Sequence, residues 1–419
     1  MRVAVLGSGG REHALLAGLA RSSSVSRLYA VPGNAGTRDL AEPVTDVAPA
    51  DPQAVADWAE RLGIELVVVG PEAPLVAGVA DELARRGLKV FGPTAAAAAI
   101  EGSKAFAKDV MAAAGVPTAA AEVFTDPGAA VAALERFGPP WVVKADGLAA
   151  GKGVTVTTDR AEAEAAIRAA LVEGVHGEAG ARVLLEAFLD GPEASLFAVT
   201  DGHTVVPLHP ARDFKRAGEG DTGPNTGGMG AYSPLADMDA AQVDEVRRTI
   251  LEPTVAELAR RGTPYTGLLY AGLALTSAGP KVIEFNCRFG DPETQVVVPR
   301  LTSDLAGLLV AACDGSLDRA ELTWDPRACV TVVLASGGYP GSYRTGLPIE
   351  GLDDAGDGMV FHAGTALDDD GRVVTAGGRV LAVSALGADV AEARALTYDA
   401  AGRIRFEGAY LRGDIAANA

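Results

Sequence analysis

Short β-branched runs alternate with alanine-rich runs from Arg2 to about Gly92, and this alternation constrains the fold more than any other feature. Strands are expected at Val3–Leu6, Leu28–Val31, Glu65–Val69 and Lys89–Phe91, and helices at Glu12–Arg21, Asp51–Leu62 and Pro74–Arg86. Strand–helix–strand alternation predicts a doubly wound parallel sheet with helices on both faces. The sequence therefore places an α/β domain at the N-terminus.

The remaining chain divides into four further segments by its pattern of strands, helices and turns. The chain has 419 residues, and this length suits about three domains. After the α/β domain at 1–102, we expect a linker helix at 103–116, a small α/β unit at 117–190, a central α+β domain at 191–325 and a C-terminal α+β domain at 326–419.

Composition limits the partners of such a protein. The formal net charge is −19, from 55 acidic and 36 basic residues, and this argues against a nucleic-acid partner, which needs clustered lysine and arginine. The three cysteines are too few and scattered for a disulfide framework. No apolar run approaches the roughly 18 residues of a membrane span, and no signal peptide is recognisable, so a cytoplasmic protein is expected.

Three glycine-containing loops follow the first three strands of the N-terminal domain. They are Gly7–Gly10, Pro32–Thr37 and Gly70–Glu72. All three fall at the carboxyl edge of the predicted sheet, where open α/β sheets bind ligands. Because Glu12 replaces the last glycine of the dinucleotide fingerprint, a small phosphorylated ligand is favoured over a dinucleotide, with ordinary tight turns as the alternative.

Three later stretches also have the composition of ligand-binding loops. Lys144–Val154 is a glycine loop with lysines between two strands, which could cradle phosphates or be a hairpin with exposed lysines. Glu186 and Glu193 flank a Gly-Pro turn, where they could accept hydrogen bonds from a nucleoside or be solvated acids. Thr222–Pro234 looks too glycine-rich for a regular element, and a ligand-lining loop is expected.

The stretch Lys281–Glu293 carries the densest chemistry. In a strand with alternating faces, Val282, Glu284, Asn286 and Arg288 would share one face, and Ile283, Phe285, Cys287 and Phe289 the other. Carboxylate and amide oxygens suit Mg²⁺ held together with substrate phosphates, and a guanidinium suits a transferring phosphoryl group. The alternative is an edge strand with a solvated polar face.

The order of these motifs resembles that of ATP-grasp ligases, and more closely that of the phosphoribosylamine–glycine ligase family (glycinamide ribonucleotide synthetases). The similar strings are Gly9–Ala14, Pro32–Thr37, Val69–Leu75, Glu101–Lys104, Lys144–Gly153, Asp221–Pro234, Glu284–Gln295 and Ser336–Gly341. They cover nearly the whole chain. The resemblance implies that ATP, glycine and 5-phosphoribosylamine are converted to glycinamide ribonucleotide, ADP and phosphate through glycyl phosphate, with Mg²⁺ or Mn²⁺.

The resemblance also implies roles for individual residues. Arg288 would be catalytic, and Glu284 and Asn286 would hold the metal. ATP would be bound by Lys104, Lys144, Asp146, Gly147, Gly151, Lys152, Gly153, Glu186, Ala187, Phe188, Leu189 and Glu193. Glycine and the phosphoribosyl group would be bound by Gly9, Gly10, Asn34, Asp213, Lys215, Arg216, Thr226, Gly227, Gly228, Met229, Asp291 and Glu293. Residues 1–102 become a substrate-binding domain, 117–190 an ATP-grasp lid and 191–325 the catalytic domain.

One departure from the broader ATP-grasp pattern bears on the metal. Many such enzymes carry a further acidic ligand on the preceding strand, but Tyr270–Ala274 contains no acid. A monomer is expected. The alternatives are a ligase for a different phosphoribosyl intermediate, a nicotinamide-dependent oxidoreductase and a non-catalytic nucleotide-binding regulator.

Overall fold

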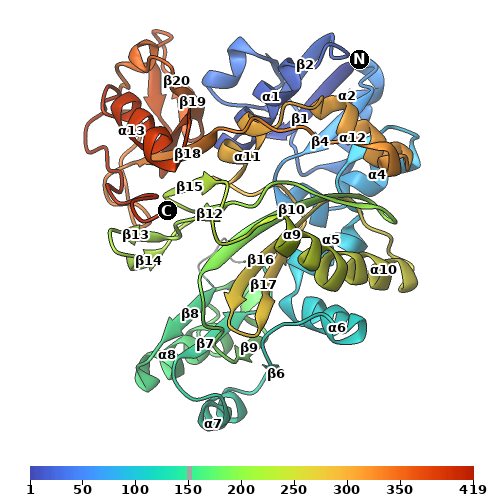
Figure 1. Ribbon diagram of the computed structural model, residues 1–419, viewed down its shortest axis with the longest axis vertical. Helices are drawn as coiled ribbons and strands as arrows, with labels where there is room; N and C mark the ends of the chain where they lie inside the picture. The colour runs from blue at the N-terminus through green and yellow to red at the C-terminus, as the bar shows by residue number, and fades with distance from the viewer. Residues whose placement is uncertain (149–152) are drawn as a thin grey trace.

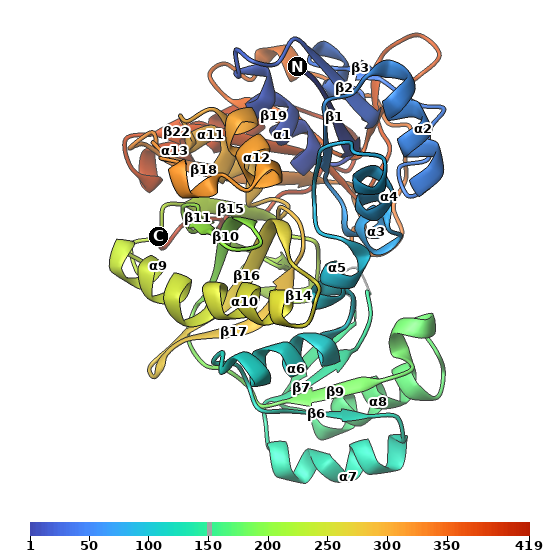
Figure 2. The same cartoon turned by 90° about the vertical axis from the view of Figure 1, so that its right-hand side faces the viewer.

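The computed structural model describes residues 1–148 and 153–419, so Gly151 and Lys152 lie outside the described residues. Figures 1 and 2 show the N-terminal sheet and the C-terminal domain side by side at one end of the molecule and the small lid domain at the other, with the central sheet between them. Among the described residues, no helix has the length and apolar character needed to cross a membrane.

The N-terminal domain is the doubly wound parallel sheet that the sequence predicts. Its strand order is β3-β2-β1-β4-β5, and the strand bounds are β1 Arg2–Gly7, β2 Arg27–Pro32, β3 Glu42–Pro43, β4 Leu66–Val69 and β5 Val90–Phe91. Helices α1 (Gly10–Ala20) and α2 (Pro52–Leu62) agree with prediction. The single helix expected at 74–86 is wrong: Gly78, with φ of 87°, separates α3 (Glu72–Val76) from α4 (Val79–Arg85).

Two helices lead from this domain into the lid. Helix α5 (Ala95–Gly102) ends at Ser103, which caps α6 (Lys104–Ala114) by accepting a hydrogen bond from the Phe106 amide. The lid sheet has the antiparallel order β6-β9-β7-β8, with β6 Ala121–Phe124, β7 Trp141–Ala145, β8 Val154–Thr157 and β9 Val183–Glu186. Helices α7 (Pro127–Phe137) and α8 (Arg160–Leu171) cover it.

The central sheet carries the strand that the sequence singled out. Its antiparallel order is β11-β10-β16-β17, with β10 Glu193–Asp201, β11 Val205–Pro207, β16 Thr266–Thr276 and β17 Gly279–Asn286. Helices α9 (Ala240–Val246) and α10 (Glu252–Arg260) are joined by a π turn at 247–251. Two helices, α11 (Thr294–Arg300) and α12 (Leu305–Asp314), follow β17.

The predicted face assignment of β17 is half wrong. Glu284 pairs with Gly272 while Val282 pairs with Leu273, so Ile283 is an extra residue that the partner strand does not match. This bulge reverses the alternation on its N-terminal side. Val282 is therefore fully buried with Phe285 and Cys287 in one core cluster, and Ile283 is only partly buried.

The C-terminal sheet borrows strands from the central region. Its order is β12-β15-β18-β22-β19, with β12 Arg212–Asp213, β15 Gly230–Ser233, β18 Ala328–Ala335, β19 Met359–His362 and β22 Arg379–Gly387. Helix α13 (Val390–Ala401) packs on it, and β20 (Thr365–Leu367) pairs with β21 (Val373–Thr375). The expectation that 222–234 forms no regular element is wrong, because β14 (Thr222–Asn225) pairs with β13 (Arg216–Gly218) and β15 pairs with β18.

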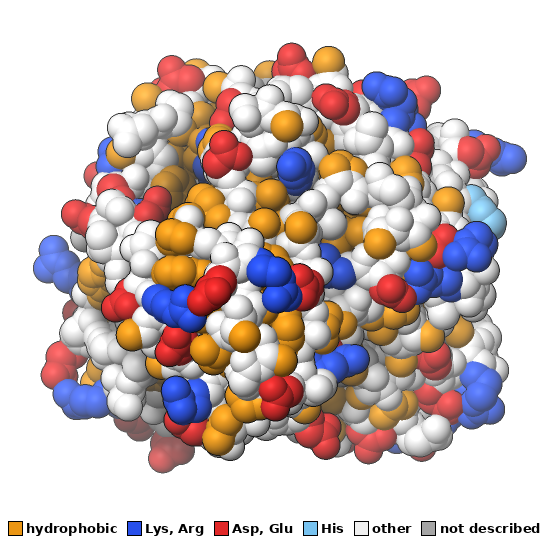
Figure 3. Space-filling model, turned by 90° about the horizontal axis from the view of Figure 1, so that it is seen from below, with side chains coloured by type: hydrophobic (Ala, Val, Ile, Leu, Met, Phe, Trp, Pro, Cys, Tyr) orange, Lys and Arg blue, Asp and Glu red, His pale blue; other side chains and the backbone are white. Residues whose placement is uncertain are grey.

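The surface of the lid end carries mixed charge. On the face seen in Figure 3, basic and acidic side chains are interspersed with apolar ones. Exposed ion pairs of the lid, such as Arg136–Glu122 at 2.5 Å and Arg160–Glu164 at 2.9 Å, follow the same pattern. Pairs of this kind favour solubility and contribute little to stability.

A buried pair of histidines joins the N-terminal and C-terminal domains. The backbone N–H of His362 in β19 donates to Nδ1 of His13 in α1 at 2.9 Å, and both side chains are buried. Burial lowers the pKa of His13 to about 3, with His362 adding to the effect, and burial lowers the pKa of His362 to about 4. Both rings are therefore neutral in the folded protein at pH values where the unfolded chain is protonated.

We expect this junction to weaken as the pH falls from about 6.5 to about 4.5. In that range each unfolded histidine binds a proton that the folded state excludes, so each lowers the free energy of unfolding by on the order of 2 kcal/mol at pH 5. Burial raises the pKa of Asp213 to about 6, and this group offsets part of the loss because it binds a proton on folding. Urea unfolding at pH 7.5 and pH 5 measures the difference.

The matched variants separate this junction from other acid effects. His13→Asn keeps an acceptor for the His362 amide but cannot be protonated, so it should reduce the pH dependence. The exposed His203 provides the control His203→Asn, which should leave the dependence unchanged. An equal pH dependence in wild type and His13→Asn would contradict the assignment.

Candidate active site

Arg288 follows β17 and lies between two carboxylates from the N-terminal region. Its Nε donates to Oε2 of Glu72 at 3.2 Å, and its Nη2 lies 3.1 Å from Oε1 of Glu101. Burial works against the charge, but Glu101 and Glu72 together raise the pKa of Arg288 above its ordinary value. The guanidinium is therefore fixed in place and charged.

Glu101 and Glu72 were quoted as parts of motifs but were not predicted as site residues. Glu101 also accepts a hydrogen bond from the Cys287 amide at 2.7 Å, so one carboxylate holds both the backbone and the side chain of the Arg288 segment. Burial opposes ionisation of Glu72, yet Arg288 and Arg11 together lower its pKa. Glu101 lies near the end of α5 and Glu72 at the start of α3, and neither position indicates a contact with Arg288. These contacts depend on how the domains pack against each other.

Glu284 and Asn286 have the donor set of a metal site. Their side chains lie on the same face of β17, two residues apart, and among the described residues no hydrogen bond or ion pair engages the Glu284 carboxylate. Asn286 Oδ1 lies 3.4 Å from Nη2 of Arg288. The described residues contain no group of three or more acidic, histidine or cysteine side chains that could hold a metal alone. The pair therefore fits a hard cation that also binds phosphates.

Strand β16 carries no side chain at the position paired with Glu284. Gly272 of β16 pairs with Glu284, and a Cβ at Gly272 would lie 3.4 Å from Cγ of Glu284. The position at which a further acidic ligand would project thus holds a glycine. This agrees with the absence of an acid in residues 270–274.

Two lysines approach this strand from the lid side. Nζ of Lys144 in β7 lies 2.8 Å from Oε2 of Glu186 and donates to the Ile283 carbonyl at 3.2 Å. Nζ of Lys104, at the start of α6, donates to the Gly147 carbonyl at 3.2 Å. Burial lowers the pKa of Lys104, and the nearby Glu284 works in the opposite direction. Both lysines predicted to bind phosphate therefore lie beside β17.

Lys108 is a further lysine that sequence reasoning missed. Its Nζ lies 3.4 Å from Oε1 of Glu186 and donates to Thr118 Oγ1 at 2.8 Å. Lys104 and Lys108 are four residues apart on α6, a spacing that places two side chains on one helix face. This spacing from Lys104 is the sequence feature from which Lys108 could have been predicted.

Asp146 ties the glycine loop to α6. Its carboxylate accepts from the Ala105 amide at 2.7 Å and lies 2.5 Å from Nη2 of Arg182, and its carbonyl accepts from the Lys104 amide. The side chain is thus engaged within the protein. Beside it, Gly147 donates its amide to Ala179, and Gly153 accepts from the Ala145 amide at 2.7 Å.

The segment after β9 has the exposure expected of a nucleotide-contacting hinge. Glu186 is buried, Ala187 and Leu189 are half-buried, and the Phe188 side chain is 48% exposed. The Ala187 amide donates to the Ala120 carbonyl at 2.9 Å, which fixes the start of the hinge. Phe188 therefore leaves a large apolar surface uncovered two residues after Glu186, the carboxylate that Lys144 and Lys108 contact.

A cluster of acids and one lysine, in which Glu193 and Lys215 are partly exposed, begins where the hinge ends at β10. Nζ of Lys215 lies 2.7 Å from Asp213 and 2.8 Å from Glu193. Burial opposes the charge of Lys215, but these two carboxylates raise its pKa well above the usual value. Glu293 accepts from Tyr270 Oη at 2.6 Å and also affects the pKa of Asp213. The four predicted residues Glu193, Asp213, Lys215 and Glu293 are therefore brought together.

The glycine loop at 226–229 is shaped by its neighbours. Thr226 Oγ1 donates to the Lys215 carbonyl at 2.9 Å, and Gly228, with φ of 110°, approaches Pro292 so closely that a Cβ would clash. Met229 is wholly buried in the main core cluster. Its side chain therefore serves packing.

Arg216 does not join the acid and lysine cluster. It begins the hairpin strand β13, donates to the Gly223 carbonyl at 2.9 Å, and lines a separate cavity of about 480 Å³ with residues of β8 and the 340–341 turn. Its side chain thus points away from Lys215, because successive residues of an extended segment face opposite ways.

The predicted N-terminal loops lie against the start of α11. A Cβ at Gly10 would lie 2.6 Å from Nε2 of Gln295, and one at Gly9 would lie 3.4 Å from Oδ2 of Asp291. Nδ2 of Asn34 donates to the Ser8 and His362 carbonyls at 2.8 and 2.7 Å. Gly9 and Gly10 thus approach the Asp291 segment, whereas the Asn34 amide is used to join loops.

This combination of a glycine-loop lid, paired lysines and a Glu-x-Asn-x-Arg strand defines an ATP-grasp ligase. Models of phosphoribosylglycinamide synthetase match the chain as N domain at residues 1–101, ATP-grasp (A) domain at 102–294 and C domain at 329–418. The chain belongs to the phosphoribosylamine–glycine ligase family.

Individual relatives support the same assignment. The phosphoribosylamine–glycine ligase of Streptomyces coelicolor is 58% identical over 100% of this chain and 99% of its own, and that of Pseudomonas aeruginosa is 52% identical over 99% and 97%. The crystal structure of phosphoribosylamine–glycine ligase from Thermotoga maritima has a TM-score of 0.86 at 33% identity, covering 99% of this chain and 100% of that one. A biotin carboxylase domain from Hydrogenobacter thermophilus, 16% identical over 98% of this chain and 91% of its own with a TM-score of 0.75, shares the fold.

Proposed function

We propose that this chain joins glycine to 5-phosphoribosylamine, with ATP as co-substrate, through a glycyl phosphate intermediate. The products are glycinamide ribonucleotide, ADP and phosphate, a step of purine biosynthesis. The observation that carries the proposal is the position of Arg288, beside Asn286 and next to the strand that Lys144 contacts. Family membership over the whole chain supports the substrates.

Activation of glycine explains the need for ATP. A carboxylate is a poor electrophile, so its oxygen first attacks the γ-phosphorus of ATP and ADP leaves. The amine nitrogen of phosphoribosylamine then attacks the carbonyl of glycyl phosphate, and phosphate leaves. Reactions of this kind depend on positioning and on stabilising charge that develops in the transition state.

Different residues would bind the different substrates and the transferred phosphoryl group. Lys104 and Lys144 would hold the ATP phosphates, and the Glu186–Leu189 hinge with Glu193 would hold the nucleoside. Arg288 would stabilise negative charge on the transferred group. Glu284 and Asn286 would hold Mg²⁺ or Mn²⁺, which would supply charge neutralisation at the phosphates. The glycine loops at 9–10 and 226–228, with Asp213 and Asp291, would contact glycine and the phosphoribosyl group.

The proposal also covers the domain boundaries, the lid and the oligomeric state. The domain boundaries 102/103, 116/117, 190/191 and 325/326 stay predictions, with 117–190 acting as a lid that excludes water from the acyl phosphate. We propose that the enzyme acts as a cytoplasmic monomer, without a nucleic-acid or membrane partner.

We expect ADP to be released only when glycine and phosphoribosylamine are both present. A panel of other amino acids and amines, followed by coupled ADP detection and mass analysis of the product, measures this. Comparable turnover with another pair would contradict the substrate assignment. With glycine carrying isotopically labelled carboxylate oxygens, label should appear in the released phosphate, and its absence would contradict the glycyl phosphate step.

A further inference from the structure

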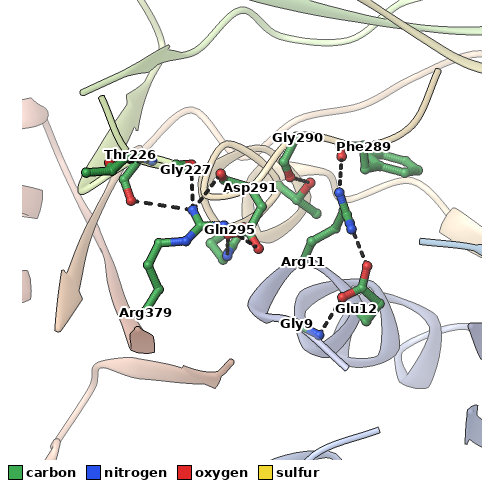
Figure 4. A network of polar contacts seen from close by, with 12 residues as sticks. Gly9, Arg11, Glu12, Thr226, Gly227, Phe289, Gly290, Asp291, Gln295 and Arg379 are labelled. Atoms are coloured by element: carbon green, nitrogen blue, oxygen red, sulfur yellow. Dashed lines mark hydrogen bonds and ion pairs between the residues drawn. The ribbon is translucent and has the colours of Figure 1, made fainter. Parts of the chain in front are cut away.

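The short segment Phe289–Asp291 is held at both ends by arginines from different domains. It directly follows Arg288 and precedes α11. Arg11 of α1 donates from Nη1 to the Phe289 carbonyl at 3.0 Å. Arg379 of β22 donates from Nη1 to the Asp291 carbonyl at 2.8 Å. Figure 4 shows the two arginines approaching the segment from opposite sides.

The Arg11 contact connects directly to Arg288. Nη1 of Arg288 lies 3.3 Å from the same Phe289 carbonyl that accepts from Arg11. Arg11 is itself oriented by Glu12, whose Oε1 lies 2.6 Å from Arg11 Nε and whose Oε2 accepts from the Gly9 amide at 2.6 Å. Arg11 and Glu12 are both buried. The side chain of Arg11 is therefore fixed, and its direction is set by the glycine loop of the N-terminal domain.

The Arg379 contact joins two parts of the substrate-facing surface. Nη1 of Arg379 also donates to the Gly227 carbonyl at 2.6 Å, and Nη2 lies 3.3 Å from Oδ2 of Asp291. A Cβ at Gly227 would lie 2.8 Å from Cζ of Arg379, so the glycine permits this approach. One guanidinium from the C-terminal domain thus holds the 226–228 loop and the Asp291 segment together.

We propose that Arg11 and Arg379 are a pair of positioning residues that fix the segment carrying Arg288. The inference rests on the role proposed for Arg288. Neither arginine is assigned to a reacting atom; each acts through the backbone of Phe289–Asp291. Because a displacement of about 1 Å at a reacting group costs up to about 100-fold in rate, loss of either anchor should reduce turnover.

The experiment compares Arg379→Ala and Arg11→Lys with two controls. Arg11→Lys keeps a positive charge beside the buried Glu12, so the fold should be preserved. A single ammonium group cannot contact both Glu12 and the Phe289 carbonyl, so the anchor on Phe289 is lost. Arg372→Ala removes an exposed ion pair with Asp368 in the same domain as Arg379. Arg21→Ala removes contacts from the far end of α1 to the Val298 and Leu301 carbonyls. Both controls should keep wild-type kcat.

A double-mutant cycle with Arg288→Ala measures the coupling of each arginine to Arg288, and a general loss of stability would not produce such coupling. Arg379→Ala and Arg11→Lys should each lower kcat by about tenfold, with little change in the KM for ATP, yet by less than about threefold in the Arg288→Ala background. A full tenfold loss in that background, a raised KM for phosphoribosylamine at unchanged kcat, or wild-type kcat would overturn the inference. Wild-type kcat in Arg288→Ala itself would instead overturn the role proposed for Arg288.

Discussion

Arg288→Ala should lower kcat by at least about two orders of magnitude, which is the loss typical of a preorganised donor to developing charge. The guanidinium is partly buried and held by Glu72 and Glu101, so it needs no reorganisation when charge forms on the transferred phosphoryl group. Substrate dissociation constants should change less, because the effect belongs to the transition state. Steady-state kinetics with coupled ADP detection measures both quantities.

The control for this prediction must keep a positive charge. Arg288→Lys retains the charge but cannot contact Glu72, Glu101 and Asn286 together, so it should recover only part of the activity. Because Arg288→Ala leaves Glu72 and Glu101 without their partner, its unfolding midpoint should be measured as well. Near-wild-type turnover of folded Arg288→Ala would refute the catalytic role.

The order of polar side chains along β17 and just after it was predictable because it depends only on local order along the chain. The spacing of Glu284, Asn286 and Arg288 alone predicts a shared face, and the structure places Oδ1 of Asn286 3.4 Å from Nη2 of Arg288. The face of Val282 was not predictable, since the bulge at Ile283 depends on pairing with Gly272 of β16. The alternation pattern contains no information about an unmatched residue in the partner strand.

The supports of the site were beyond prediction for a different reason. Glu72, Glu101 and Arg379 reach the Arg288 segment from positions between 88 and 216 residues away along the chain. The sequence alone does not select a partner for a polar side chain in a loop or at a helix end, because such a side chain can be solvated in many equally favourable conformations. Its role appears only when the domains are packed, as with Asn34, whose amide joins two loops.

Glu284→Gln should abolish measurable turnover, with an expected loss of at least about three orders of magnitude, because a metal that stabilises transferred charge contributes several kcal/mol. The amide keeps the size of the side chain and leaves the fold intact, since no described residue pairs with the carboxylate. Metal affinity gives a readout independent of turnover: titration of Mn²⁺ in the presence of a non-hydrolysable ATP analogue, followed by electron paramagnetic resonance, should show weakened binding.

A second variant tests the single-metal geometry from the opposite strand. Gly272 faces Glu284, so Gly272→Asp would place a further carboxylate at the metal site. It should tighten Mn²⁺ binding in the same titration and restore part of the binding that Glu284→Gln loses, because each added carboxylate increases the charge and the number of hard ligands. Unchanged metal affinity in both Glu284→Gln and Gly272→Asp would place the metal elsewhere, and would leave Arg288, just after β17, as the catalytic group of this segment.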